Sequence, residues 1–448
     1  MPNKSLTKVG VISLGCPKNL VDTEVMLGLI NNSGYVITHD ESEADVVLVN
    51  TCGFIDASQR ESVSTVLDIA NSGKKVIMAG CLLERFREDK IEEKMPEVSA
   101  FIGTNEITNI VNVLDKVTGY ERKEENILDY FSAEFSVPRY STGFGSFAYV
   151  KVSEGCDHPC TFCIIPKLRG KNHSRPISSI VQEVTQLAEN GINEVVLVAQ
   201  DLTAYGHDLD KKQVNLTKLL EELVKIPNSP YYRLLYTYPG TITQELLDLM
   251  AKEEKILKYI DMPLQHSHTE VLKLMKRPFI EEKIEDLLLR MRKTIPELIL
   301  RTTFIVGFPG EKKEHFEHLC EFVKRHKFDH VGVFTYSKEE GTPAGEVTEQ
   351  VKQRVKIKRR KELMSIQHEI VKEKNDKLIG KVLPMFVEGV IPEKGQVYGR
   401  TYRDAPEIDG FTTIKGEAEP GDIVNIKITK VKVYDTFGEI VESVKSEK

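Results

Sequence analysis

Three cysteines lie within eight residues of one another and form a Cys-x3-Cys-x2-Cys pattern. Cys156, Cys160 and Cys163, here called the barrel triplet, stand in the segment GCDHPCTFCIIP, directly after a strand-like stretch. Three thiolates at this spacing can ligate three irons of a 4Fe-4S cluster and leave the fourth iron open to a substrate or cofactor. A structural zinc site usually takes four ligands from paired Cys-x2-Cys motifs, and this sequence has no second pair. The pattern therefore favours an iron–sulfur cluster over zinc.

Three further cysteines share a structural position rather than a local motif. Cys16, Cys52 and Cys81, here called the N-terminal triplet, each follow an apolar run that predicts a buried strand. Because the carboxyl ends of neighbouring parallel strands meet at one edge of a sheet, these thiols can converge on a second cluster. The alternative is three buried cysteines that act as small hydrophobic side chains. The seventh cysteine, Cys320, lies on the apolar face of a predicted helix, and we expect it in the core.

The segments around the N-terminal triplet predict the elements that must position it. From Val9 to about Val117, short apolar runs alternate with amphipathic stretches such as Lys18–Ile30 and Ala57–Asn71. This alternation predicts a doubly wound parallel α/β domain. A charged and then turn-rich stretch between about residues 118 and 142 indicates a domain boundary.

The rest of the chain predicts a barrel-like core and a small β-domain. Between residues 147 and about 334, six strand-like runs alternate with helical patterns, which predicts a partial (β/α)6 barrel. A long charged helix is predicted over Val351–Asp376. From Lys377 five short alternating strands separated by glycines are typical of a small OB-like barrel. We therefore predict an α/β multidomain chain with domains at residues 6–120, 142–375 and 377–445.

The composition is that of an ordinary globular chain. Its 448 residues include 61 Lys plus Arg and 68 Asp plus Glu, a net charge of −7, and 40% are hydrophobic. This balance excludes a collagen-like or fully disordered chain and lacks the global basic field of a protein that coats nucleic acid. No apolar run reaches about 20 residues and the first residues show no signal-peptide core, so we expect a cytoplasmic protein without a membrane segment. In that compartment cysteines are more often metal ligands or catalysts than disulfides.

The barrel triplet, placed after the first strand of a six-fold βα repeat, resembles the radical S-adenosylmethionine (SAM) superfamily. In that superfamily the open iron chelates SAM, and electron transfer cleaves SAM to a 5′-deoxyadenosyl radical. With its N-terminal triplet and small C-terminal β-domain, nearly the whole chain resembles the methylthiotransferases, which join an N-terminal methylthiotransferase domain, a radical SAM core and a TRAM domain. Within this family the chain resembles the RimO-like branch. The motifs that carry this resemblance are SLGCPKNLVDTE, NTCGFID, YVKVSEGCDHPCTFCIIPKLRG, LVAQDLTAYG, DMPLQH, TTFIVGFPGE and GRTYRDAPEIDG.

This resemblance implies a reaction and its cofactors. The RimO-like branch adds a methylthio group to the β-carbon of an aspartyl residue of the small-subunit ribosomal protein S-twelve. The resemblance implies a 4Fe-4S cluster on each triplet, with SAM cleaved at the barrel triplet and sulfur delivered from the N-terminal triplet. It further implies two SAM molecules per turnover, an electron donor, a sulfur source and no catalytic residues beyond the cluster ligands. One departure is His268, which stands where the branch usually has a small hydroxyl residue.

Five side chains are candidates for contacts with SAM. Phe162 holds the place before the third cysteine where the superfamily usually has an aromatic residue, and it can equally be a packing residue. The four others are polar residues at or near the carboxyl ends of predicted barrel strands, where barrel active sites lie. They are Gln200, Asp201, Gln265 and Arg301.

Three other features each have two interpretations. His266 and His268 follow a predicted strand and can either touch a ligand or form a solvated loop pair. The GFPGE segment at Gly307–Glu311 can let the backbone approach a ligand closely or can be a simple turn. The basic run from Lys352 to Lys361 can grip ribosomal RNA phosphates, but we expect a solvated helix face.

Two alternatives to an aspartate methylthiotransferase stay open at this point. A MiaB-like tRNA methylthiotransferase, acting on a modified adenosine next to the anticodon, would keep all six ligands but would need a last domain that binds RNA. A non-enzymatic iron–sulfur or zinc protein would hold metal without cleaving SAM. Residues 377–442 carry nine basic and eleven acidic side chains, a net charge of −2, whereas a domain that grips tRNA should be strongly basic. The charge therefore favours a basic protein partner such as S-twelve.

Overall fold

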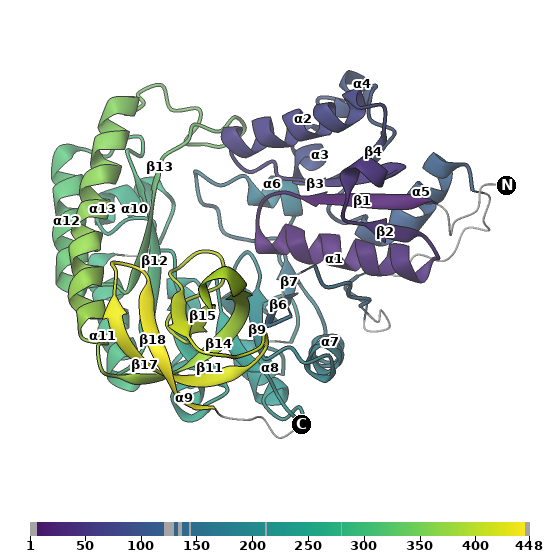
Figure 1. Ribbon diagram of the computed structural model, residues 1–448. Helices are drawn as coiled ribbons and strands as arrows, with labels where there is room; N and C mark the ends of the chain where they lie inside the picture. The colour runs from purple at the N-terminus through teal and green to yellow at the C-terminus, as the bar shows by residue number, and fades with distance from the viewer. Residues whose placement is uncertain are drawn as a thin grey trace.

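The computed structural model describes residues 7–120, 130–132, 137–142, 145–210, 213–278 and 280–443. Within them the chain forms a five-stranded sheet, a six-stranded sheet, a closed five-stranded barrel and a two-stranded pairing, arranged as Figure 1 shows. Much of the boundary predicted between residues 118 and 142 lies outside the described residues. None of the described helices is long and apolar enough to cross a membrane.

The N-terminal sheet is parallel and has the strand order β2-β1-β3-β4-β5. Its strands are β1 (Lys8–Ser13), β2 (Val36–Thr38), β3 (Val46–Thr51), β4 (Lys75–Gly80) and β5 (Ala100–Ile102). Its helices are α1 (Pro17–Asn32), α2 (Asp56–Asn71), α3 (Cys81–Phe86), α4 (Ile91–Lys94) and α5 (Ile110–Thr118). Leu48 shares a core cluster with Val21 of α1, whereas Val47 and Val49 share another with Val66 of α2. Helices therefore cover both faces of the sheet (Figure 1), which confirms the doubly wound prediction.

The strands β2 and β5 are not identified by the sequence pattern. Each has only three residues, and three residues are too few to show a period of two. They pair with β1 and β4 and so lie at the two edges of the sheet.

The central sheet consists of six parallel strands that follow one another in chain order. They are β6 (Phe147–Lys151), β9 (Glu194–Val198), β10 (Tyr231–Leu234), β11 (Ile256–Asp261), β12 (Ile299–Val306) and β13 (His330–Thr335). The longer helices between them are α7 (Ile177–Glu189), α8 (Leu216–Leu223), α9 (Gln244–Lys252), α11 (Glu281–Thr294) and α12 (Lys313–His326). The short elements are β7 (Ser153–Glu154), α6 (Ile165–Arg169), β8 (His173–Ser174) and α10 (Thr269–Leu274). Because β6 and β13 do not pair, the sheet stays open, which confirms the predicted partial barrel.

The long helix α13 (Gln353–Asp376) lies beside α12 and β13 and leads into the C-terminal barrel (Figure 1). The barrel closes in the order β14-β15-β16-β18-β17. Its strands are β14 (Val382–Ile391), β15 (Gln396–Thr401), β16 (Thr412–Lys415), β17 (Ile423–Val431) and β18 (Thr436–Ser443). A small closed barrel of five strands confirms the OB-like prediction.

The loop between β15 and β16 joins this barrel to the central sheet. Asp409 of the loop accepts a hydrogen bond from the Tyr259 hydroxyl at 2.6 Å and pairs with Arg301 at 3.3 Å. Arg400, in β15, pairs with the buried Glu194 at 2.8 Å. The C-terminal barrel therefore shares buried charges with the core and does not behave as a detached module.

Candidate functional site

The N-terminal triplet lies where β1, β3 and β4 end, at the carboxyl edge of the parallel sheet. Two glycines let these strand ends come close together. A Cβ atom on Gly15 would lie 2.9 Å from the Cβ of Cys52, and one on Gly53 would lie 2.6 Å from the carbonyl oxygen of Cys81. Gly15 also has a φ of +97°, which glycine adopts without strain. The fold thus gathers three cysteines that no local motif joins.

The barrel triplet lies on the loop that follows β6 and β7. Within the motif the Cys163 N–H donates to the carbonyl of Cys160 at 3.2 Å, which makes a tight turn. Thr161 anchors this turn from outside: its N–H donates to the carbonyl of Met275 at 3.1 Å and its hydroxyl to that of Leu274 at 2.8 Å. The end of α10 therefore supports the loop while its cysteines stay free of disulfides.

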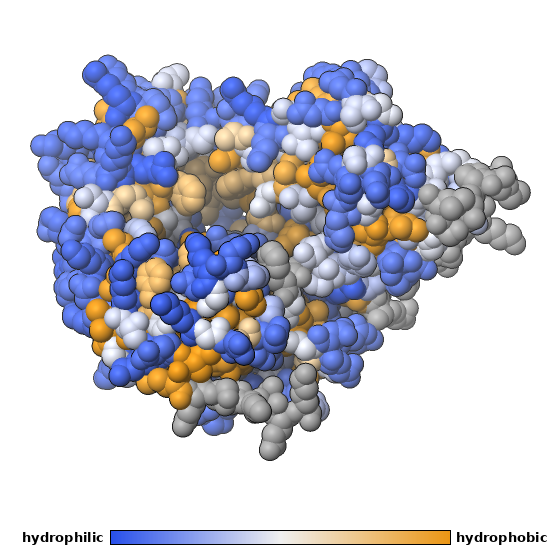
Figure 2. Space-filling model, viewed as in Figure 1, coloured by the Kyte–Doolittle hydropathy of each residue, from blue (hydrophilic) through white to orange (hydrophobic). Residues whose placement is uncertain are grey.

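Both triplets line one cavity of about 450 Å³ between the N-terminal domain and the central sheet. Apolar side chains, among them Phe54, Ile55 and Leu168, form part of its wall. Figure 2 shows the molecule hollowed between these two parts, with hydrophobic surface inside the hollow and hydrophilic residues around it. The volume is in the range of about 300–1,000 Å³ that small-molecule and cofactor sites occupy.

Burial raises the pKa values of thiols in both triplets. Burial raises the pKa of Cys81 to about 11; Arg169 lowers it, whereas the neighbouring Cys16 raises it further. Burial also raises the pKa of Cys163 to about 12, and Cys160 adds to this shift. A metal that binds these groups must displace their protons. Each triplet presents three soft sulfur ligands close together, a donor set that fits an iron–sulfur cluster with one open iron.

Three of the four polar residues predicted to contact SAM, Gln200, Asp201 and Gln265, line the same cavity. The side-chain oxygens of Gln200 and Gln265 are buried and accept no hydrogen bond from any residue that the structure describes. Asp201 shares a hydrogen bond of 2.6 Å with the imidazole of His158, which belongs to the barrel-triplet motif. Buried acceptors without a partner suit a ligand that carries donors. The ammonium group and ribose hydroxyls of SAM are such donors, so Gln200 and Gln265 fit SAM.

Phe162 and Arg301 differ in their relation to the cavity. Phe162 lines it and also packs edge-on against Phe308, with ring centroids 6.4 Å apart, so it has both of the roles considered for it. Arg301 does not line the cavity, and its predicted place near the carboxyl end of a strand is wrong, because it is the third residue of β12. Its guanidinium pairs with Asp261 at 2.9 Å and with Asp409 at 3.3 Å. Arg301 therefore joins the central sheet to the loop between β15 and β16, and its contact with SAM stays a prediction.

His266, His268 and the GFPGE turn do not line the cavity. His266 is fully buried, so the interpretation as a solvated loop residue is wrong for it. His268 caps α10 by accepting a hydrogen bond from the Glu270 N–H at 3.3 Å. In the turn, Glu311 accepts a hydrogen bond from the Phe308 N–H at 3.0 Å, which makes the segment a self-stabilised turn. Cys320 is buried among core side chains, as predicted.

The basic run at the start of α13 is only partly a solvated face. Lys356 is buried and donates to the carbonyl of Tyr336 at 2.7 Å. Arg359 is buried and pairs with Glu311 at 3.0 Å. The prediction of a solvated face is therefore wrong for these two residues, because residues three apart lie on one side of a helix, and this side faces the core. The exposed members of the run are Lys352, Arg354, Lys358, Arg360 and Lys361.

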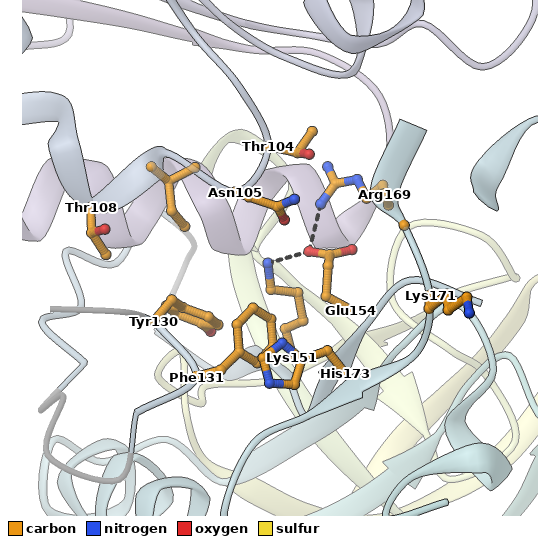
Figure 3. A pocket seen from close by; sticks show the side chains of 12 residues that line it. Thr104, Asn105, Thr108, Tyr130, Phe131, Lys151, Glu154, Arg169, Lys171 and His173 are labelled. Atoms are coloured by element: carbon orange, nitrogen blue, oxygen red, sulfur yellow. Dashed lines mark hydrogen bonds and ion pairs between the residues drawn. The ribbon is translucent and has the colours of Figure 1, made fainter. Parts of the chain in front are cut away.

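A buried network of four charges joins α1 to the segment around the barrel triplet. Arg169 donates to Asp22 at 2.9 Å and to Glu154 at 2.8 Å, and Lys151 donates to the same two carboxylates. Figure 3 shows Arg169 and Lys151 both directed at Glu154, beside a second cavity of about 420 Å³. The Nε of Arg169 also donates to the Sγ of Cys81 at 3.2 Å. Because the two signs balance, the network can stay buried beside the N-terminal triplet.

Replacing Arg169 by Met is expected to lower the free energy of unfolding by about 3–5 kcal/mol, because it removes one of the two cations that pair with the buried carboxylates of Asp22 and Glu154. Urea unfolding of the metal-free chain, followed by circular dichroism, measures the loss. The control is Lys167→Met, since Lys167 pairs with Glu88 on the surface, where a pair contributes little. Equal urea midpoints for the two variants would contradict the role given to Arg169.

Lys18, Tyr236 and Arg277 also line the cavity, and none of them is among the predicted site residues. Lys18 follows Cys16 by two residues, and this nearness to a predicted ligand is the signal that points to it. Tyr236 and Arg277 lie far from either cysteine motif along the chain, so only the folded structure brings them to the site.

Three segments of the chain match known protein families. Residues 8–103 match the Uncharacterized protein family UPF0004, residues 150–323 match the Radical SAM superfamily, and residues 379–441 match the TRAM domain. These segments correspond to the N-terminal α/β sheet, the central sheet and the C-terminal barrel.

Over nearly its full length the chain is similar to proteins named ribosomal protein uS12 methylthiotransferase RimO, uS12 being the S-twelve protein. It is 46% identical to that of Synechococcus sp. (strain JA-3-3Ab) over 442 residues, 98% of this chain and 95% of that protein. It is 44% identical to that of Thermosynechococcus vestitus over 447 residues, 99% of each chain. It is 43% identical to that of Nostoc punctiforme over 436 residues, 97% of this chain and 99% of the other.

Solved structures share the fold at low identity. The radical SAM methyltransferase TsrM from Kitasatospora setae, bound to cobalamin and a 4Fe-4S cluster, superposes with a TM-score of 0.57 at 16% identity over 76% of this chain and 77% of that chain. The cobalamin-dependent SAM radical enzyme OxsB superposes with a TM-score of 0.51 at 12% identity over 82% of this chain and 58% of that chain. These likenesses concern the arrangement of the elements alone.

Proposed function

Because this chain belongs to the family of ribosomal protein uS12 methylthiotransferases, the radical SAM enzymes named RimO, we propose that it adds a methylthio group to the β-carbon of an aspartyl residue of uS12. The observation that carries the proposal is the convergence of two cysteine triplets on one cavity. A structural metal protein has no need of two three-thiol sites that face a shared space. The similarity to RimO proteins over the whole chain supports this function over the tRNA-modifying alternative.

We assign one 4Fe-4S cluster to each triplet, with SAM at the barrel triplet and two SAM molecules used per turnover. Support comes from the three thiols of each triplet and from the unpartnered acceptors of Gln200 and Gln265. When bound, the clusters and SAM supply hydrogen-atom abstraction, the sulfur and its methyl group. An electron donor and a sulfur source complete the set of partners, and we place the reaction in the cytoplasm.

The protein's own part is to hold the two triplets on fixed elements and to keep water away from them. We assign the sulfur-delivering domain to residues 6–120, the radical SAM core to residues 142–375 and the TRAM domain to residues 377–445. Strand ends carry the first triplet and an anchored loop carries the second. The apolar wall around Phe54, Ile55 and Phe162 limits stray hydrogen donors, which a radical reaction must exclude.

The C-terminal barrel is expected to suit a protein partner better than tRNA. Six of its charged side chains contact the core or one another: Glu388, Arg400, Arg403, Asp404, Glu407 and Asp409. Without these six, the sequence from residue 377 to 442 leaves seven basic and seven acidic side chains. Such a neutral balance lacks the excess of basic charge that grips nucleic-acid phosphates. We propose that the exposed basic residues of α13 contact ribosomal RNA.

The reconstituted chain, given SAM, a reductant and sulfide, is expected to methylthiolate uS12 and to leave tRNA unmodified. Mass spectrometry of uS12 and tRNA after the reaction measures this. The same measurement is made on uS12 and tRNA from a strain that lacks the gene. Because the chain carries a net charge of −7 and ribosomal proteins are basic, its affinity for uS12 should weaken as salt rises. Tight, salt-sensitive tRNA binding with no methylthio-aspartate on uS12 would overturn the proposed function.

A further inference from the structure

Lys18 is a buried cation of the six-cysteine cavity, and none of the carboxylates that the structure describes forms an ion pair with it. Its Nζ lies 3.5 Å from the carbonyl oxygen of Ala199, at the limit of a hydrogen bond. It also lies 3.6 Å from the centroid of the Tyr236 ring. A buried ammonium group without an anion is unfavourable. A fold that keeps one at a cavity wall is therefore arranged to receive an anionic ligand.

Among the residues that the structure describes, Lys18 lacks an ion-pair partner although an acidic residue lies near it on α1. Asp22 lies one turn after Lys18 on α1, a spacing at which opposite charges usually pair. Its carboxylate instead binds Lys151 and Arg169 in the buried network. Those two cations are thereby neutralised, while the charge of Lys18 stays available to a ligand.

Tyr236 supports the ammonium group and is itself held in an unusual conformation. Its φ of +62° is left-handed, which few aromatic residues adopt. Its N–H donates to Asp261 at 3.0 Å, and its carbonyl accepts from the Leu202 N–H at 2.9 Å. Strain of this kind persists only where the surroundings enforce it, and it clusters at ligand sites. The ring face therefore gives Lys18 a fixed position through a cation–π contact.

We propose that Lys18 binds the side-chain carboxylate of the target aspartyl residue and so selects aspartate over asparagine, an inference that rests on the proposed function. The reacting β-carbon is bonded directly to the carboxylate carbon. The group that holds the carboxylate must therefore lie next to the site of sulfur delivery, and Lys18 follows Cys16 by two residues at the start of α1. Arg277, the other cavity cation without an ion pair among the described residues, lies 3.9 Å from the Sγ of Cys160 and so belongs to the opposite triplet.

The test is Lys18→Met in the full reconstituted enzyme, assayed on two substrates. One is uS12, and the other is uS12 in which the modified aspartate, located by mass spectrometry, is replaced by asparagine. In the unaltered enzyme kcat/KM for the aspartate form should exceed that for the asparagine form by about 100-fold, as expected when a buried charge pair loses one partner. In Lys18→Met the kcat/KM for the aspartate form should fall about 100-fold, and the ratio between the two forms should approach one.

Three controls separate this role from a structural one. Lys18→Arg keeps the charge and should keep the preference for aspartate, and Lys167→Met, a change at a surface ion pair, should match the unaltered enzyme. The iron content of Lys18→Met should equal that of the unaltered enzyme. An unchanged ratio, a loss of iron, or a change confined to the KM for SAM would overturn the role of Lys18. Failure of the unaltered enzyme to modify uS12 would instead overturn the proposed function.

Discussion

Methylthiolation of uS12 is expected to fall to background when Cys16, Cys52 and Cys81 are replaced together by alanine, whereas reductive cleavage of SAM continues. The three thiols lie at strand ends of the N-terminal sheet, and the barrel triplet lies on a loop of the central sheet. Because separate elements hold the two triplets, removing one leaves the ligands of the other in place. Chromatography of 5′-deoxyadenosine and mass spectrometry of uS12 measure the two activities.

Iron analysis provides an independent measure of this variant. A chain with two 4Fe-4S clusters holds about eight irons, and the triple variant should hold about four. Cys320→Ala is the matched control, since it removes a buried cysteine that lies in the core and away from the cavity. This control should keep all its iron and both activities. Normal methylthio product from the triple variant would refute the sulfur-delivery role of the N-terminal triplet.

Replacing Cys156, Cys160 and Cys163 together by alanine is expected to abolish both SAM cleavage and methylthiolation. The barrel triplet lines the same cavity as the unpartnered acceptors of Gln200 and Gln265, which fit SAM. Loss of its cluster removes the open iron that SAM needs. Anaerobic reconstitution followed by iron analysis should again give about four irons per chain, now on the N-terminal triplet.

The iron content of this second variant tests which residues are the ligands of the barrel cluster. If it kept about eight irons, the ligands assigned to the barrel cluster would be wrong. Hydrogen bonds from Thr161 to the end of α10 hold the loop, and these bonds do not involve the thiols. The loop should therefore keep its fold. The loss of SAM cleavage would then result from the missing cluster and not from unfolding. Circular dichroism matching that of Cys320→Ala would verify this.

Local spacing in the sequence was enough to identify the barrel triplet, because its ligands come from one short loop. The N-terminal triplet was also predictable, since each cysteine directly follows a long apolar run and β1, β3 and β4 are neighbours in one parallel sheet. The six strands of the central sheet and the closed C-terminal barrel followed from hydrophobic periodicity. The three-residue strands β2 and β5 and the two-residue strand β8 were too short for this pattern.

The partners of individual charges were decided by the tertiary structure alone. Arg301 was expected near the carboxyl end of its strand, yet it is the third residue of β12, and its guanidinium pairs with Asp409, which lies more than a hundred residues later in the chain. Arg359 belongs to a basic run, yet it is buried against Glu311. Lys18 lies one turn from Asp22, yet that carboxylate is taken by Lys151 and Arg169 from the central domain. Periodicity indicates which residues face inward, but the ion pair that forms depends on which distant segments the fold brings within about 4 Å.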